Sequence, residues 1–157
     1  MKNLIVYFSA SGTTKRAASK LAEEVNGTLY EIVPKQIYSA EDLDWTDKSS
    51  RSSIEIKNLN LRPEIEDITM DINLFDTIYV GFPIWWGKEP KIILTLLDDY
   101  NLEGKTIIPF CTSGSSGIET SVGNLRKYND KLNVLDGKRF SKNTSKDEIK
   151  SWIESYK

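Results

Sequence analysis

Histidine is absent from the 157-residue sequence, and cysteine occurs only once, as Cys111. The lack of histidine excludes zinc clusters of the usual kind, Ser-His triads and acid–base catalysis by an imidazole. A single cysteine excludes a disulfide within the chain. We therefore assign no metal ligand and no catalytic side chain, and we expect any redox or catalytic chemistry to come from a cofactor.

Long hydrophobic runs are also missing. No apolar stretch approaches the length of a membrane span, and the first eight residues lack the basic and apolar regions of a signal peptide. We expect no membrane association and a cytoplasmic location. The net charge of −2 argues against a nucleic-acid partner. With 39% hydrophobic and 28% charged residues, the composition predicts one globular domain over residues 1–157.

Short apolar runs alternate with segments of helical periodicity along the whole chain. The predicted strands cover residues 4–8, 28–33, 77–82, 106–111 and 131–135. This alternation favours an α/β fold with a five-stranded parallel sheet covered by helices on both faces. The chemically unusual loops follow the first, third and fourth strands, which predicts the order 2-1-3-4-5. Pro109 lacks an N–H group, so we expect a bulge or an early strand end there.

A turn rich in hydroxyl groups follows the first strand and precedes a helix. It contains Ser9, Ser11, Gly12, Thr13 and Thr14. Such a turn directs N–H groups, hydroxyl groups and the positive end of the helix dipole toward one point, which predicts a phosphate site. Neither the G-x-G-x-x-G signature nor the nucleotide-triphosphate loop is present. An ordinary turn with capping residues is the alternative interpretation.

Two further loops belong to the same predicted edge of the sheet, because the carboxyl ends of parallel strands lie together. The first contains Pro83, Ile84, Trp85, Trp86 and Gly87, and the second contains Thr112, Ser113, Gly114, Ser115 and Gly117. Two adjacent tryptophans in a loop are costly unless something covers them. We expect one to pack under the following helix and the other to face a ligand. The second loop offers small donors for the edge of a polar ring.

Residues 9–14 resemble the phosphate loop of the flavodoxins, in which hydroxyl residues at the first, third and sixth positions accompany a glycine at the fourth. The resemblance extends over the whole chain and implies the flavodoxin-like three-layer sandwich with bound FMN. It implies that Ser9, Ser11, Gly12, Thr13 and Thr14 hold the phosphate. Residues 83–87 would border the isoalloxazine ring, and residues 112–117 would contact its pyrimidine edge.

The resemblance implies a monomeric electron carrier that uses FMN to shuttle electrons between soluble redox enzymes. A small FMN-dependent NAD(P)H:quinone-type oxidoreductase of the same fold is the alternative, because residues 112–117 lack the aromatic residue that flavodoxins usually supply there. A flavin-free protein of this fold is a third possibility. Residues 35–62 form a long polar connection, with possible helices at 40–43 and 49–58, that we expect at the cofactor's rim or at a docking surface.

Overall fold

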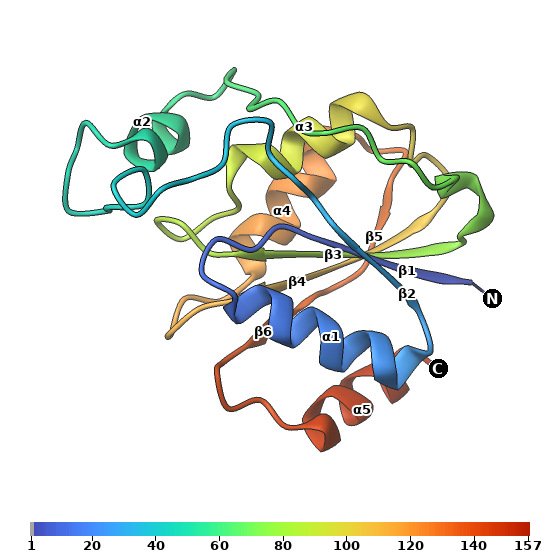
Figure 1. Cartoon of the computed structure of the whole chain (residues 1–157). Helices are drawn as coiled ribbons and strands as arrows, with labels where there is room; N and C mark the ends of the chain where they lie inside the picture. The colour runs from blue at the N-terminus through green and yellow to red at the C-terminus, as the bar shows by residue number, and fades with distance from the viewer. Residues whose placement is uncertain (1) are drawn as a thin grey trace.

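The computed structural model describes residues 2–157 and shows a parallel sheet with helices on both faces (Figure 1). The strands are β1 (Asn3–Tyr7), β2 (Thr28–Glu31), β3 (Thr77–Pro83), β4 (Thr106–Thr112), β5 (Asn133–Val134) and β6 (Lys138–Phe140). Their order is β2-β1-β3-β4-β5, and β6 also pairs with β4. Every pairing between these strands is parallel. The predicted α/β fold and the strand order 2-1-3-4-5 are confirmed.

Five α-helices and one short 3-10 helix complete the described part of the chain. They are α1 (Thr13–Val25), α2 (Arg51–Lys57), η1 (Ile72–Leu74), α3 (Lys91–Asp99), α4 (Glu119–Tyr128) and α5 (Lys146–Glu154). In Figure 1, α3 and α4 cover one face of the sheet, and α1 and α5 cover the other. These two helical layers and the sheet between them form the predicted three-layer sandwich.

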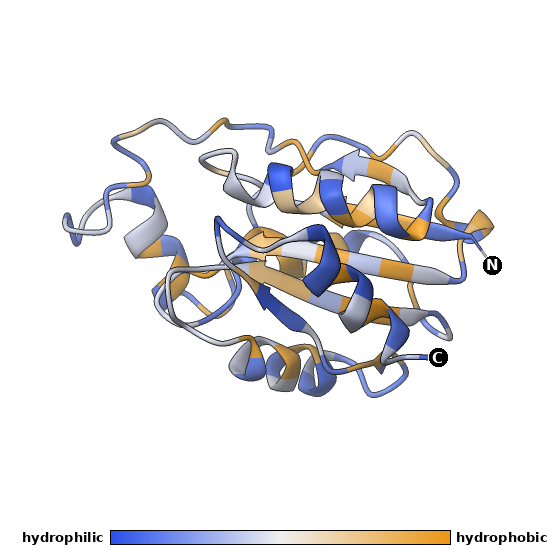
Figure 2. Cartoon of the chain, turned by 90° about the horizontal axis from the view of Figure 1, so that it is seen from below, coloured by the Kyte–Doolittle hydropathy of each residue, from blue (hydrophilic) through white to orange (hydrophobic). Residues whose placement is uncertain are grey.

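Strand β1 is buried on both faces, as its unbroken apolar run predicts. Leu4 and Val6 belong to the core that includes residues of α3 and α4, whereas Ile5 and Tyr7 belong to the core that includes residues of α1 and α5. The side chains of a strand alternate between faces, so a central strand of a covered sheet needs apolar residues at every position. Figure 2 shows the resulting hydrophobic sheet between helices that are polar on their outer sides.

The sheet has six strands rather than the predicted five, because residues 131–135 are only part of a longer, interrupted strand. β5 pairs Val134 with Ile107, and β6 pairs Lys138 with Phe110. From Ile107 to Phe110 the chain of β4 advances three positions, while its partner advances four from Val134 to Lys138. One extra residue between paired positions is a bulge.

The bulge lies opposite Pro109. Ile107 accepts a hydrogen bond from the N–H of Leu135 (3.0 Å), and Pro109, two positions further on, faces the same neighbour without an N–H to donate. The chain passes so close there that a Cβ on Gly137 would lie 2.2 Å from the Pro109 carbonyl oxygen. β4 itself continues through Pro109, so the predicted irregularity occurs on the partner strand.

The connection from β2 to β3 contains what we call the cap segment, residues 38–58. Its helix α2 confirms the helix predicted around 49–58, whereas residues 40–43 form turns rather than a helix. Figure 1 shows α2 beyond the ends of β1 and β3 from which the loops to α1 and α3 depart. The cap segment therefore lies at the edge of the sheet where a ligand site is expected.

Candidate functional site

The loop between β1 and α1 is closed by the side chain of Ser9. Its hydroxyl oxygen accepts hydrogen bonds from the N–H groups of Gly12 (3.1 Å) and Lys15 (3.2 Å). Gly12 has a φ of 95°, which glycine adopts without the steric penalty of other residues. The loop is thus held against the first turn of α1 by one of its own side chains.

Several N–H groups of this loop are available to a ligand. Across residues 2–157, no protein acceptor is bonded to the N–H groups of Ser11, Thr13 or Thr14. Thr13 and Thr14 begin α1, where the first N–H groups of a helix have no partner within it. The Ser11 and Thr13 hydroxyl oxygens lie 3.5 Å apart, and Arg16 donates to the Thr13 hydroxyl at 3.4 Å. Donors collected at the positive end of a helix bind an oxyanion.

The hydroxyl of Thr14 points into the protein, unlike those of Ser11 and Thr13. Thr14 is 1% exposed, and its hydroxyl oxygen lies 2.7 Å from that of Thr112. This buried pair joins the loop after β1 to the end of β4. Because one of the two hydroxyl groups donates to the other, only one O–H of the pair is left for another acceptor.

The loop after β3 makes a tight turn between Trp85 and Lys88. The Trp85 N–H donates to the Lys88 carbonyl at 2.9 Å, and the Lys88 N–H donates to the Trp85 carbonyl at 3.2 Å. The two central residues both have positive φ, 49° at Trp86 and 80° at Gly87, as in a type I′ turn. Glycine tolerates this conformation, but a tryptophan is strained in it, and such strain is concentrated at functional sites.

The two tryptophans have different surroundings. Trp85 packs edge-on against Phe8 and Tyr38, with ring centroids 5.8 Å and 5.5 Å away. Trp86 is 47% exposed. One tryptophan is therefore packed and the other open, but the aromatic partners of Trp85 come from the end of β1 and the cap segment rather than from α3. Which of the two faces a ligand stays a prediction, because both line the same cavity.

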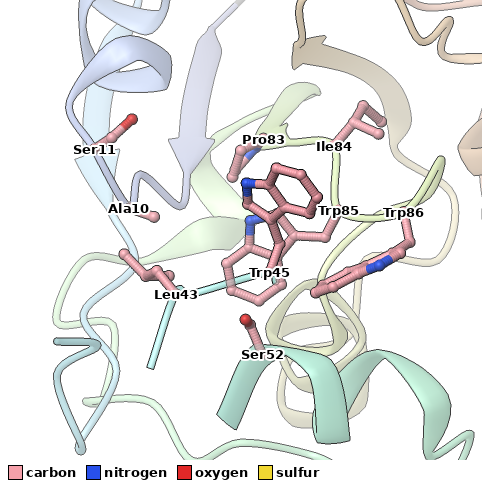
Figure 3. Close-up of a pocket in the computed structure, with 9 residues that line it drawn as sticks. All are labelled: Ala10, Ser11, Leu43, Trp45, Ser52, Pro83, Ile84, Trp85 and Trp86. Atoms are coloured by element: carbon pink, nitrogen blue, oxygen red, sulfur yellow. The ribbon is translucent and has the colours of Figure 1, made fainter. Parts of the chain in front are cut away.

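A cavity of about 350 Å³ lies between the two loops and the cap segment (Figure 3). Its lining residues are Ala10, Ser11, Leu43, Trp45, Ser52, Pro83, Ile84, Trp85 and Trp86. The structure thus brings together the loops after β1 and β3, as predicted from their positions at the ends of parallel strands. The cavity has three indole rings in its wall and the phosphate-type loop at one side.

Sequence reasoning did not identify the three lining residues of the cap segment, Leu43, Trp45 and Ser52. The available signal was Trp45, a large aromatic residue in an otherwise polar stretch, which is 73% exposed in the structure. An exposed tryptophan is unfavourable unless a ligand or a partner covers it. Nothing in the sequence indicates that Trp45 lies close to Trp85, because the two belong to segments that meet only in the folded chain.

The loop after β4 contributes differently from the other two. Ser113, Gly114, Ser115 and Gly117 do not line the 350 Å³ cavity, and Thr112 faces Thr14. The loop is held by Arg139, whose guanidinium donates to the carbonyl groups of Ser113 (3.0 Å) and Gly114 (3.3 Å). It therefore lies beside the cavity without covering it.

Cys111 is fully buried within β4, next to this loop. Burial raises the pKa of its thiol to about 12, so the sulfur is protonated at neutral pH. Since the thiolate is the reactive form, Cys111 is a structural residue of the sheet.

Comparisons with known proteins identify the family of the chain. A flavodoxin family model matches residues 2–156. The chain belongs to the flavodoxin family. This flavodoxin-family chain is 43% identical to a protein of known structure from Bacteroides eggerthii DSM 20697. The match covers 98% of this chain and 96% of the Bacteroides eggerthii chain, with a TM-score of 0.94. A structure from Bacteroides uniformis ATCC 8492 is 45% identical over 98% and 97% of the two chains, with a TM-score of 0.93.

A flavoprotein from Lactobacillus acidophilus NCFM, solved in complex with FMN, is 30% identical to the flavodoxin-family chain. The match covers 97% of this chain and 98% of that one, with a TM-score of 0.73. A search of curated protein sequences finds no match. In the described part of the chain, no helix has both the length and the apolar character needed to span a bilayer. Over the same residues, no group of three or more potential metal ligands is assembled.

Proposed function

We propose that the chain binds FMN at the carboxyl ends of β1 and β3 and transfers electrons between soluble redox proteins in the cytoplasm as a monomer. The observation that carries this proposal is the placement of a cavity with three indoles directly beside a loop with unpaired N–H donors. These are the two environments that a flavin mononucleotide requires, a flat apolar ring site and a phosphate site. The FMN complex of the Lactobacillus acidophilus relative supports the assignment.

The residues present fit an FMN phosphate. The N–H groups of Ser11, Thr13 and Thr14 and the hydroxyl groups of Ser11 and Thr13 would donate to it, while Ser9 and Gly12 maintain the shape of the loop. No cation is needed in direct contact, because the helix dipole and the donors stabilise a dianion. Arg16 lies at the edge of this group through its bond to Thr13.

The ring site would be formed by residues 83–87, with the small residues of the loop after β4 available to the polar edge of the flavin. Bound FMN would supply the redox chemistry through its isoalloxazine ring. The protein's own contribution is to bind the ring, to limit its contact with water, and to leave one side accessible for electron transfer. Trp86, which lines the cavity and is 47% exposed, would lie on that side.

A second candidate is an FMN-dependent reductase that oxidises NAD(P)H. It is favoured by one observation: none of residues 113–117 lines the cavity, and residues 114–117 are exposed. A second planar substrate needs access to the face of the ring, whereas an electron carrier needs only one accessible side.

Titration with FMN and with riboflavin tests the proposal. We expect FMN to bind with a visible absorption spectrum that differs from free FMN, and riboflavin to bind at least about 100-fold more weakly because it cannot use the phosphate donors. Equal binding of both, or no binding of FMN, would contradict the proposal. Steady oxidation of NADH or NADPH by the FMN-loaded protein alone, with a quinone as acceptor, would identify the reductase instead of the carrier.

A further inference from the structure

The cap segment contains a buried polar group without a partner at the wall of the cavity. Ser52 is 2% exposed, and its hydroxyl oxygen is bonded to no other atom among residues 2–157. Two other buried hydroxyl groups are also unpaired, those of Thr95 and Ser121, but neither residue lines this cavity. Figure 3 shows the Ser52 hydroxyl directed from α2 toward the side of the cavity occupied by Trp45. A buried hydroxyl without a partner costs free energy, which a ligand bound in the cavity would recover.

The same wall carries exposed apolar surface. Trp45 is 73% exposed although it lines the cavity, and Leu43 lies beside the same space. Apolar surface at the mouth of a cavity, combined with a directed polar group, is the usual composition of a site for a flat heteroaromatic ligand. The loops after β1 and β3 contribute the opposite wall, so a ring in the cavity would be enclosed by three segments.

The cap segment is held together by its own side chains and contacts the loop after β3 through Tyr38. Arg51 donates to Glu55 at 2.8 Å and lies 3.7 Å above the ring of Tyr38. The Tyr38 hydroxyl donates to the other oxygen of Glu55 at 2.5 Å. Tyr38 in turn packs against Trp85, the inner wall of the cavity. These contacts position α2, and with it Ser52, relative to the loop after β3.

We propose that the cap segment is a third flavin-binding element, in which Trp45 and Leu43 contact the isoalloxazine ring and the Ser52 hydroxyl donates a hydrogen bond to its polar edge. This inference rests on the proposed binding of FMN. It adds a wall that the resemblance to flavodoxins does not imply, since that resemblance places the ring between the loops after β3 and β4. It also gives the polar connection between β2 and β3 a role in recognising the ring rather than the phosphate.

Ser52→Ala separates this role from a structural one. Because the hydroxyl has no partner in the protein, its removal should leave the melting temperature of the FMN-free protein unchanged or slightly raised. FMN affinity, measured by quenching of flavin fluorescence, should fall about threefold to tenfold, the value of one hydrogen bond. Ser121→Ala is the matched control, a buried unpaired hydroxyl away from the cavity, and it should leave the affinity unchanged.

Trp45→Ala should weaken FMN binding by about tenfold or more, and Trp45→Phe should restore most of the affinity, because an aromatic face is what the ring contacts. Ile54→Ala, which removes an exposed apolar side chain from the same segment, should have no effect. The near-ultraviolet and visible circular dichroism of bound flavin should change in Trp45→Ala but not in Ile54→Ala. If the wild type binds FMN and both Ser52→Ala and Trp45→Ala bind it within twofold of the wild type, the inference is wrong. If the wild type binds no FMN, the proposed function itself is wrong.

Discussion

The loop after β1 and the cap segment border one cavity but are held in different ways. In the loop, the Ser9 hydroxyl bonds to groups no more than six residues away. In the cap segment, Tyr38 bonds to Glu55, seventeen residues away, and packs against Trp85 from another loop. A structure made of neighbouring residues appears as a motif in the sequence, whereas one made of distant residues does not. The phosphate-type loop was therefore predictable residue by residue. For the cap segment only a place at the cofactor's rim or at a docking surface was expected, and its lining residues were not identified.

The largest expected effect comes from breaking the local structure of the loop with Ser9→Ala. Two N–H groups lose their acceptor, which we expect to cost about 1–3 kcal/mol of loop stability and to lower FMN affinity by about tenfold to 100-fold. Isothermal titration with FMN gives the affinity. Ser19→Ala serves as the control, because the Ser19 hydroxyl donates to the Lys15 carbonyl within α1 and bonds to no group of the loop. Equal affinities for the two variants would show that Ser9 does not shape the site.

In the cap segment, we expect the most damaging substitution at Glu55, whose partner Tyr38 lies seventeen residues away in the sequence. Glu55 is 4% exposed and accepts hydrogen bonds from both Arg51 and Tyr38. Glu55→Gln removes the ion pair, and we expect it to destabilise the cap by about 1–3 kcal/mol. Burial and the bond to Glu55 raise the pKa of Tyr38. In Glu55→Gln this pKa should fall toward that of free tyrosine, which absorbance at 295 nm during an alkaline titration would report.

Limited proteolysis provides the second readout for Glu55→Gln. Cleavage within residues 38–58 should become faster, while cleavage in the loop after β1 should stay at the wild-type rate. Glu66→Gln, at an exposed position outside the cap, is the control. Faster cleavage throughout the chain would indicate a global loss of stability and would contradict the separate attachment of the cap.

The smallest expected effect concerns the turn between Trp85 and Lys88 in the loop after β3. Gly87 has a φ of 80° and open space around its Cα, so Gly87→Ala adds backbone strain without a clash. We expect a loss of about 1 kcal/mol in the free energy of unfolding, measured by urea denaturation of the FMN-free protein. Gly114 also has open space around its Cα but no positive φ. Gly114→Ala should therefore change the free energy of unfolding by only about a few tenths of 1 kcal/mol. Equal losses would show that the turn is not strained.

Much of the fold follows from local patterns. The apolar runs and the helical periodicity predict the alternation of strands and helices, and the position of the unusual loops predicts the strand order. The interrupted strand β5–β6 was missed because its cause is on another strand, where Pro109 has no N–H for the chain beside it. The orientation of Thr14 toward Thr112 was missed for the same reason, since the partner lies 98 residues away.

The buried position of Cys111 has a practical consequence. It lies in β4, and its side chain belongs to the core that includes residues of α3 and α4, so a thiol reagent reaches the sulfur only when that core opens. As the chain has no other cysteine, the rate of labelling reports how often this core opens. A ligand that binds only the folded form would slow this labelling in proportion to its occupancy. The labelling rate of one natural side chain therefore measures both local unfolding and ligand binding, with no cysteine added to the sequence.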